Sequence, residues 1–159
     1  MTTARLISVE ELPELLAPEA RLLGLDVGTK TIGMALSDVT RSIATPYDTI
    51  RRTKFTDDAK AIRKVLESNQ VGAVVIGLPI NLDGTEGPRA QSTRAFARSL
   101  AAQIDLPLLF WDERLSTAVV ERHLIEADAS RTRRADVIDR MAAAYILQGA
   151  LDRLRRLAQ

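Results

Sequence analysis

The chain has 159 residues, of which 46% are hydrophobic and 27% charged, and its formal net charge is +1. This length and composition fit one globular domain with a substantial core, not two full domains. The chain contains no cysteine, which excludes disulfides, thiolate catalysis and cysteine-ligated zinc. Its single histidine, His123, cannot form a multi-histidine metal site within one chain.

The first 20 residues differ in charge from the rest of the chain. They contain Arg5 against four glutamates, a net charge of −3, so the remaining chain carries +4, which permits a nucleic-acid partner. Two prolines keep any helix there short, and we expect an acidic N-terminal arm (residues 1–20) that packs loosely through Leu12, Leu15 and Leu16. No apolar run reaches the roughly 18 residues of a membrane span and no signal-peptide pattern is present, so we expect a cytoplasmic protein.

Residues 21–38, RLLGLDVGTKTIGMALSD, predict a β-hairpin. Apolar residues alternate on both sides of a tight turn at Gly28, Thr29 and Lys30. Asp26 lies within the first strand, where loss of hydration makes a carboxylate costly unless a positive partner lies against it.

The following segments alternate between strands and helices. Residues 42–50 predict an edge strand interrupted by Pro46, and Thr56 caps a helix. Residues 71–78 form a continuous apolar run typical of a buried parallel strand, and residues 79–88 form a loop rich in glycine, aspartate and proline. A long helix follows at residues 89–103.

Residues 106–111 predict the fifth strand. A helix capped by Ser116 or Thr117 runs to about residue 126, residues 127–134 form a basic loop that we expect to be mobile, and residues 135–157 form the final helix. This order of elements predicts an α/β domain at residues 21–159, with a mixed five-stranded sheet and helices on both faces.

Three acids occupy positions that solubility does not explain. Asp26 lies in a strand, Glu113 follows the carboxyl end of the fifth strand, and Asp139 lies near the start of the final helix, on the side expected to face the sheet. Carboxylates brought together repel unless a cation joins them, and Mg²⁺ and Mn²⁺ prefer oxygen ligands. Two such ions can activate water for phosphodiester hydrolysis. The alternative from the residues alone is that the three acids form unrelated salt bridges or helix caps.

Four motifs carry a resemblance to a known family. The motifs GLDVGTKTIGMALSD, VVIGLPINLDGTEGPRA, WDERLST and IDRMAAAYIL resemble the YqgF family, also called RuvX, and the resemblance covers essentially residues 20–154. Its members are named as pre-16S rRNA nucleases or as Holliday-junction-resolvase-like proteins. The resemblance implies an RNase H-like fold and a divalent-metal active site with Asp26, Glu113 and Asp139 as catalytic, metal-binding residues. It also implies attack by a metal-bound water that leaves 3′-hydroxyl and 5′-phosphate ends.

Other polar residues are weaker candidates for the site. Asp136, one helical turn before Asp139, is either a fourth metal ligand or an acid favoured by the helix dipole. Asp112 is expected either to support a metal ligand without binding the metal itself or to pair with an arginine. The candidate contacts to substrate phosphates are five cations: Lys30, Arg114, Arg131, Arg133 and Arg134.

The favoured function is a Mg²⁺- or Mn²⁺-dependent endonuclease in 16S rRNA 5′-end maturation. Its expected partners are pre-16S rRNA and ribosomal particles, and it is expected to act as a monomer or homodimer. One alternative is a Holliday junction resolvase, which acts on branched DNA and needs two active sites. Another is a non-catalytic RNA-binding factor for ribosome assembly. An actin- or sugar-kinase-like ATPase, suggested by DVGTKTIG, needs a second domain that this length does not supply. Only 4% of residues are aromatic, so we expect recognition by backbone shape and charge, not by a stacking platform.

Overall fold

The computed structural model describes residues 5–115 and 131–159, and for residues 131–137 it describes the backbone alone. The strands are β1 (Leu6–Ile7), β2 (Arg21–Val27), β3 (Thr31–Ser37), β4 (Ala44–Arg51), β5 (Val71–Leu78) and β6 (Leu108–Asp112). The helices are α1 (Phe55–Ser68), α2 (Pro88–Ala101) and α4 (Arg131–Leu157), with 3₁₀ turns η1 (Val9–Leu15) and η2 (Glu113–Leu115). None of the helices in this described part is both long and apolar enough to cross a membrane.

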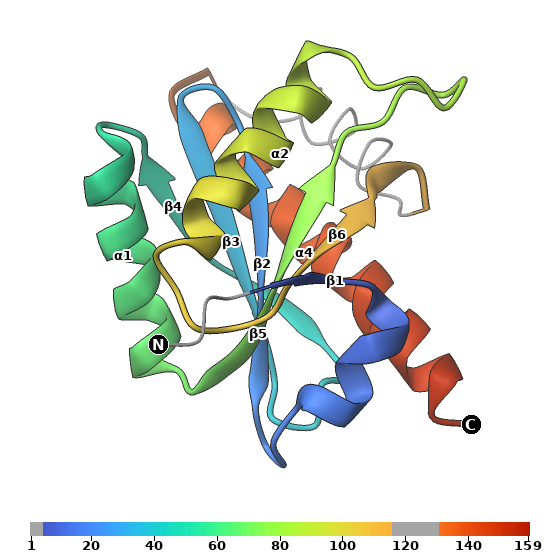
Figure 1. Cartoon of the computed structure of the whole chain (residues 1–159). Coiled ribbons are helices and arrows are strands. Elements are labelled where there is room, and N and C mark those ends of the chain that lie inside the picture. The colour runs from blue at the N-terminus through green and yellow to red at the C-terminus, as the bar shows by residue number, and fades with distance from the viewer. Residues whose placement is uncertain (1–4, 116–130) are drawn as a thin grey trace.

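The strands form one mixed sheet in the order β1-β6-β5-β2-β3-β4 (Figure 1). β2 and β3 pair antiparallel, which confirms the predicted hairpin, and β4 continues the antiparallel half as an edge strand. β2, β5 and β6 run parallel, so their carboxyl ends meet at one edge of the sheet. In open α/β sheets, this is the edge where ligands bind.

Helices cover both faces of the sheet, as predicted (Figure 1). α1 and α2 pack on one face, where Ile62, Phe96 and Leu100 join apolar side chains of the central strands in one buried cluster. α4 packs on the other face, where Ile146 and Leu147 belong to a second buried cluster. Because Asp139 belongs to α4, strand residues can lie close to it only if their side chains are on this second face of the sheet.

Residues 5–20 of the N-terminal arm are part of the packed structure. β1 pairs parallel with β6 and adds a sixth strand to the five that were predicted. The Leu12 side chain of η1 is fully buried in the cluster beneath α4, although Leu15 is exposed. The prediction of loose packing is therefore wrong, because an acidic, proline-containing segment can still dock through one buried leucine and a short backbone pairing.

Two helix boundaries also differ from the prediction. In the described part of the chain α4 spans Arg131–Leu157, so residues 131–134 are helical and do not belong to a loop. Arginine has a helix propensity close to that of leucine, so a basic segment without an apolar period can extend a helix. α1 begins at Phe55, with Lys54 and not Thr56 at the N-cap. The predicted helix at 116–126, with His123, and the predicted loop residues 127–130 lie outside the described residues.

Candidate active site

Asp26 lies one residue before the end of β2, at the carboxyl edge of the parallel strands. Its side chain is only 2% exposed, and the residue pairs across the antiparallel ladder with Gly33 of β3. Directly paired residues place their side chains on the same face of a sheet. Asp26 therefore shares a face with whatever packs against Gly33.

The backbone of α4 packs against Gly33. A Cβ atom at this position would overlap the carbonyl group of Asp139 and would come within 2.7 Å of the backbone nitrogen of Arg140. Only a glycine lets the helix come this close to β3. The contact places Asp139 on the face of the sheet that carries Asp26, one strand away.

A second glycine, Gly77, lies between Asp26 and Glu113. Leu25 pairs with Ile76, so Asp26 and Gly77 are next to one another on the neighbouring strands β2 and β5, while Gly77 pairs with Trp111 on β6. A Cβ at Gly77 would lie 3.3 Å from Cγ of Glu113 and would overlap Ile146 of α4. Glu113, 4% exposed at the start of η2, thus places its side chain over β5 on the α4 face.

Thr31 orients the third acid. Its hydroxyl donates a hydrogen bond to Oδ2 of Asp139, and the threonine side chain is buried. Thr31 precedes Gly33 by two residues on β3, so both positions face α4. This contact was missed by the sequence analysis, although a threonine in an apolar strand beside a predicted turn was a visible signal.

The three carboxylates match the chemistry of a hard divalent cation. All the side-chain atoms that could bind a cation are oxygens, and two of the three acids are buried, where a bound cation would offset the cost of desolvation. Among the side chains that the structure describes, those of residues 5–115 and 138–159, however, no three acidic or histidine side chains are close enough to form a ready-made metal cluster. The three acids lie at the same end of the sheet face that α4 covers, and a hydrogen bond holds the Asp139 carboxylate against Thr31.

Arg52 fixes the turn that joins β2 to β3. Its backbone N–H donates to the Lys30 carbonyl at 2.8 Å, and its Nη1 donates to the Gly28 carbonyl at 2.6 Å. The guanidinium also lies 3.9 Å from Oδ2 of the buried Asp58 and 5.3 Å from the ring centroid of Phe96. Arg52 therefore connects the turn at the site to α1 and α2, a role that the sequence did not indicate.

Arg114 is held in an ion pair. Its Nη2 donates to Oδ2 of Asp112 at 2.7 Å and its Nε lies within hydrogen-bond distance of both oxygens, which confirms the predicted pairing of Asp112 with an arginine. The hydrogen bond from Arg114 lowers the pKa of Asp112, and the same bond raises the pKa of Arg114. Arg114 thus approaches the site with most of its charge already balanced.

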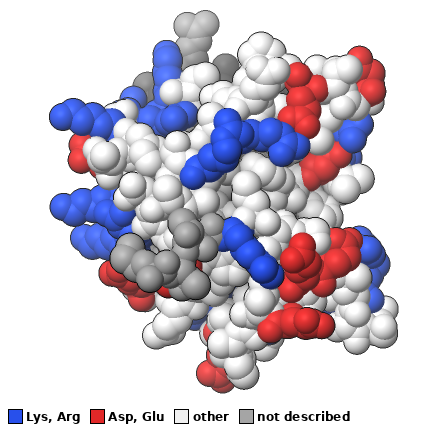
Figure 2. Space-filling view, in the orientation of Figure 1, with Lys and Arg blue, Asp and Glu red and all other residues white. Residues whose placement is uncertain are grey.

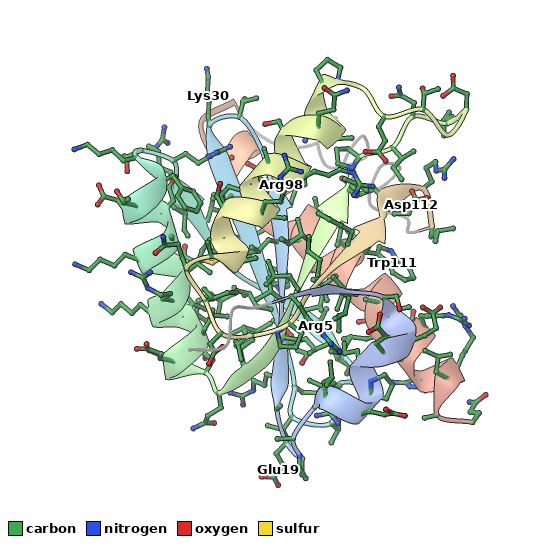
Figure 3. All side chains as sticks on the ribbon, viewed as in Figure 1. Arg5, Glu19, Lys30, Arg98, Trp111 and Asp112 are labelled. Carbon is green, nitrogen blue, oxygen red and sulfur yellow. The ribbon has the colours of Figure 1, made fainter. Side chains whose placement is uncertain are left out.

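The remaining candidates fall into two groups. Lys30 is exposed in the β2–β3 turn and makes no ion pair with a described residue (Figure 3). The backbones of Arg131, Arg133, Arg134 and Asp136 lie in the first turns of α4, on the same helix as Asp139. Their side chains lie outside the described part, so their roles as phosphate contacts and fourth ligand stay predictions.

Comparison with known proteins identifies the family. The model of the RuvX family, described as "Holliday junction resolvase", matches residues 20–153. A protein of Methylocella silvestris named "Putative pre-16S rRNA nuclease" is 58% identical over 154 residues, which cover 97% of this chain and 96% of the relative. A protein of Paramagnetospirillum magneticum with the same name is 60% identical over 147 residues, covering 92% and 95%.

Solved structures show the same fold at low sequence identity. RuvC of T. thermophilus, in complex with a Holliday junction substrate, superposes with a TM-score of 0.54 at 13% identity, covering 85% of this chain and 96% of that one. The yeast mitochondrial Holliday junction resolvase Ydc2 superposes with a TM-score of 0.50 at 13% identity, covering 93% and 85%. The chain therefore belongs to the RuvX family and is a nuclease with an RNase H-like fold.

Proposed function

We propose that this protein is a divalent-metal-dependent endonuclease that cleaves pre-16S rRNA during maturation of the 16S 5′ end, in the cytoplasm. The observation that carries the proposal is that Asp26, Glu113 and Asp139 lie on the same face of the sheet, at the carboxyl edge of the parallel strands. The names of the relatives favour pre-16S rRNA as the substrate, free or in ribosomal particles.

Asp26, Glu113 and Asp139 would hold Mg²⁺ or Mn²⁺, and Asp136 is the candidate fourth ligand. When bound, such ions supply an activated water and stabilise the charge that develops on the phosphate. The chain's own residues do the positioning: β2 and η2 bury two carboxylates, and Thr31 fixes the third. Lys30, on a turn braced by Arg52, offers an exposed cation to the phosphates.

The test is cleavage of two substrates by the same set of variants. Wild-type protein with Mn²⁺ or Mg²⁺ should cut a pre-16S transcript, and chelation by EDTA should stop the reaction. Asp26→Asn, Glu113→Gln and Asp139→Asn should each abolish cleavage and keep the circular-dichroism spectrum of the folded protein. Asp105→Asn, an exposed acid beside the amino end of β6, is the control and should cleave normally.

Cleavage of a four-way DNA junction, assayed in parallel, distinguishes the main alternative from an rRNA nuclease. Preferential junction cleavage by a dimer in sedimentation would favour a Holliday junction resolvase, the activity in the description of the family model. If the wild type cuts neither substrate yet binds RNA, and Asp26→Asn binds equally well, the protein would be an RNA-binding assembly factor. Either outcome would overturn the proposal of an rRNA nuclease.

A further inference from the structure

Two exposed leucines flank the carboxyl ends of neighbouring strands at the site. Leu82, in the loop that follows β5, is 93% exposed, and Leu115, two residues after Glu113, is 68% exposed. They are the two most exposed large apolar side chains in the described part of the chain. Single exposed leucines are common on protein surfaces, but two on the rim of one site call for an explanation.

The loop that carries Leu82 is well ordered by its own hydrogen bonds. The Asn81 backbone N–H donates to the Thr85 carbonyl at 2.9 Å, and the Gly84 N–H donates to the Asn81 carbonyl at 2.8 Å. The Thr85 hydroxyl donates to Oδ1 of Asp83 at 2.6 Å. Leu82 is therefore presented to solvent by a fixed turn, which lowers the entropic cost of binding a partner there.

The loop lies against η2. A Cβ at Gly84 would be 3.7 Å from Nη1 of Arg114, and the charge of Asp83 contributes to the raised pKa of Arg114. Because Arg114 adjoins both Glu113 and Leu115 in sequence, this contact connects the loop of Leu82 to the segment that holds a proposed metal ligand. The two leucines thus belong to one rim of the site.

This rim does not favour phosphates. Arg114 is paired with Asp112, and Arg94 is paired with Glu86 at 2.6 Å. With Asp83 and the exposed Arg89 added, these side chains carry no net charge. Figure 2 shows red and blue side chains mixed at the upper right, the side on which Figure 3 labels Asp112.

The opposite rim has the reverse character. Lys30 in the β2–β3 turn, Arg51 at the end of β4 and Lys54 before α1 are all exposed, and none forms an ion pair with a described residue. Blue side chains predominate there at the upper left of Figure 2. Phosphates are therefore attracted to the turn side of the site, which leaves the rim with Leu82 and Leu115 for the uncharged part of a nucleotide.

We propose that Leu82 and Leu115 contact unstacked bases next to the cleaved phosphate. The faces of bases are the apolar surfaces of a nucleic acid, and leucine is among the side chains that proteins insert between bases. In a regular duplex these faces are covered, whereas loops, bulges and single strands expose them. The enzyme then selects a site whose stacking is interrupted. This inference rests on the proposed nuclease function and adds a preference for unpaired RNA.

The experiment measures binding without cleavage. In the Asp26→Asn background, fluorescence anisotropy gives the affinity for a perfect RNA duplex and for the same duplex with a short bulge that contains 2-aminopurine. Leu82→Ser, Leu115→Ser and the double variant are compared with Ile43→Ser. Ile43 is 63% exposed next to the β3–β4 turn, at the far end of the sheet, so it controls for loss of an exposed apolar side chain.

We expect the double variant to lose about tenfold or more in affinity for the bulged RNA, with little change for the duplex and a smaller 2-aminopurine signal. The dependence of affinity on salt should stay unchanged, whereas Lys30→Ala should reduce its slope by about 0.7–0.9. Because the leucines are exposed, serine should not lower the melting temperature. An unchanged ratio of bulged to duplex affinity would overturn the inference and leave the nuclease proposal intact. If the Asp26→Asn parent binds neither RNA, the inference fails, and cleavage by the wild type tests the nuclease proposal separately.

Discussion

The Thr31 hydroxyl donates a hydrogen bond to Oδ2 of Asp139, which lies 108 residues further along the chain. The bond joins the strand that leaves the β2–β3 turn to the helix that covers the site. Two residues beyond Thr31, Gly33 admits the helix backbone to direct contact with the strand. The position of Asp139, a proposed metal ligand, therefore depends on two features of β3: the hydroxyl of Thr31 and the absence of a side chain at Gly33.

Thr31→Val tests the hydroxyl, because valine has nearly the same shape as threonine. A hydrogen bond to a charged group contributes ~1.5–3 kcal/mol, so we expect urea denaturation to show a loss of this order and cleavage to fall at least about tenfold. Thr31→Ser keeps the hydroxyl and should retain most of the stability and most of the cleavage activity. If Thr31→Val costs the same stability in an Asp139→Ala background, the hydrogen bond is not the cause.

Gly33→Ala tests the close approach of the helix. The added methyl group would meet backbone atoms of Asp139, which cannot rotate away, so α4 must shift from β3. We expect a loss of about 1–3 kcal/mol in unfolding free energy, together with a loss of cleavage.

The matched control for Gly33→Ala is Ile62→Ala on α1. Ile62 is fully buried on the opposite face of the sheet, and its truncation should cost ~2–5 kcal/mol. Cleavage at a temperature where both variants are folded separates the two effects. Equal residual activity would mean that Gly33 acts on stability alone.

Local patterns were sufficient to predict most of the sheet. Alternating or continuous apolar runs predicted β2, β3 and β5, and the parallel strands then had to bring Asp26 and Glu113 to the same edge. An acid in an apolar strand is unusual enough to be noticed without a structure. The strands and two of the site's acids were therefore predictable from properties of single segments.

The contacts that assemble the site were not predictable in this way. The close approach of Asp139 to Gly33 and of Ile146 to Gly77 depends on where a distant helix docks. Nothing in the sequence around either glycine distinguishes it from a glycine that is needed for a turn. β1 has two residues, too few to show a period. Arg114 could be read as a phosphate contact because its bond to Asp112 forms only in the geometry of η2.

Asp38 should make stability depend on pH. Its Oδ1 accepts hydrogen bonds from the backbone N–H groups of Ser42 and Ile43 at 2.7 and 3.0 Å, and the Thr40 hydroxyl donates to Oδ2. These bonds, that from Thr40 first, lower the pKa of Asp38 from 3.8 to about 2. A lowered pKa stabilises the folded state above the unfolded value, and this contribution disappears as the pH falls from 3.8 towards 2.

Asp38→Asn should therefore lower the melting temperature at pH 6, and the difference from wild type should shrink as the pH approaches 2. Differential scanning calorimetry between pH 2 and pH 6 measures this difference directly. A constant difference across the range would show that the lost hydrogen-bond geometry, and not the charge of Asp38, sets the effect.

Leu12→Ala tests whether the N-terminal arm stabilises the domain. Leu12 is fully buried among apolar side chains of the sheet and α4, so its truncation should cost ~2–5 kcal/mol in urea denaturation. Leu15, 44% exposed on the same 3₁₀ turn, is the matched control, and Leu15→Ala should cost less than about 1 kcal/mol.

Arg153→Ala removes the exposed ion pair with Glu10 at 3.4 Å and should also change the stability little, since exposed pairs contribute ~0–1 kcal/mol. A large loss for Leu12→Ala alone would show that one buried leucine attaches the arm, whereas small and equal losses for all three would mean that the arm detaches without cost to the domain.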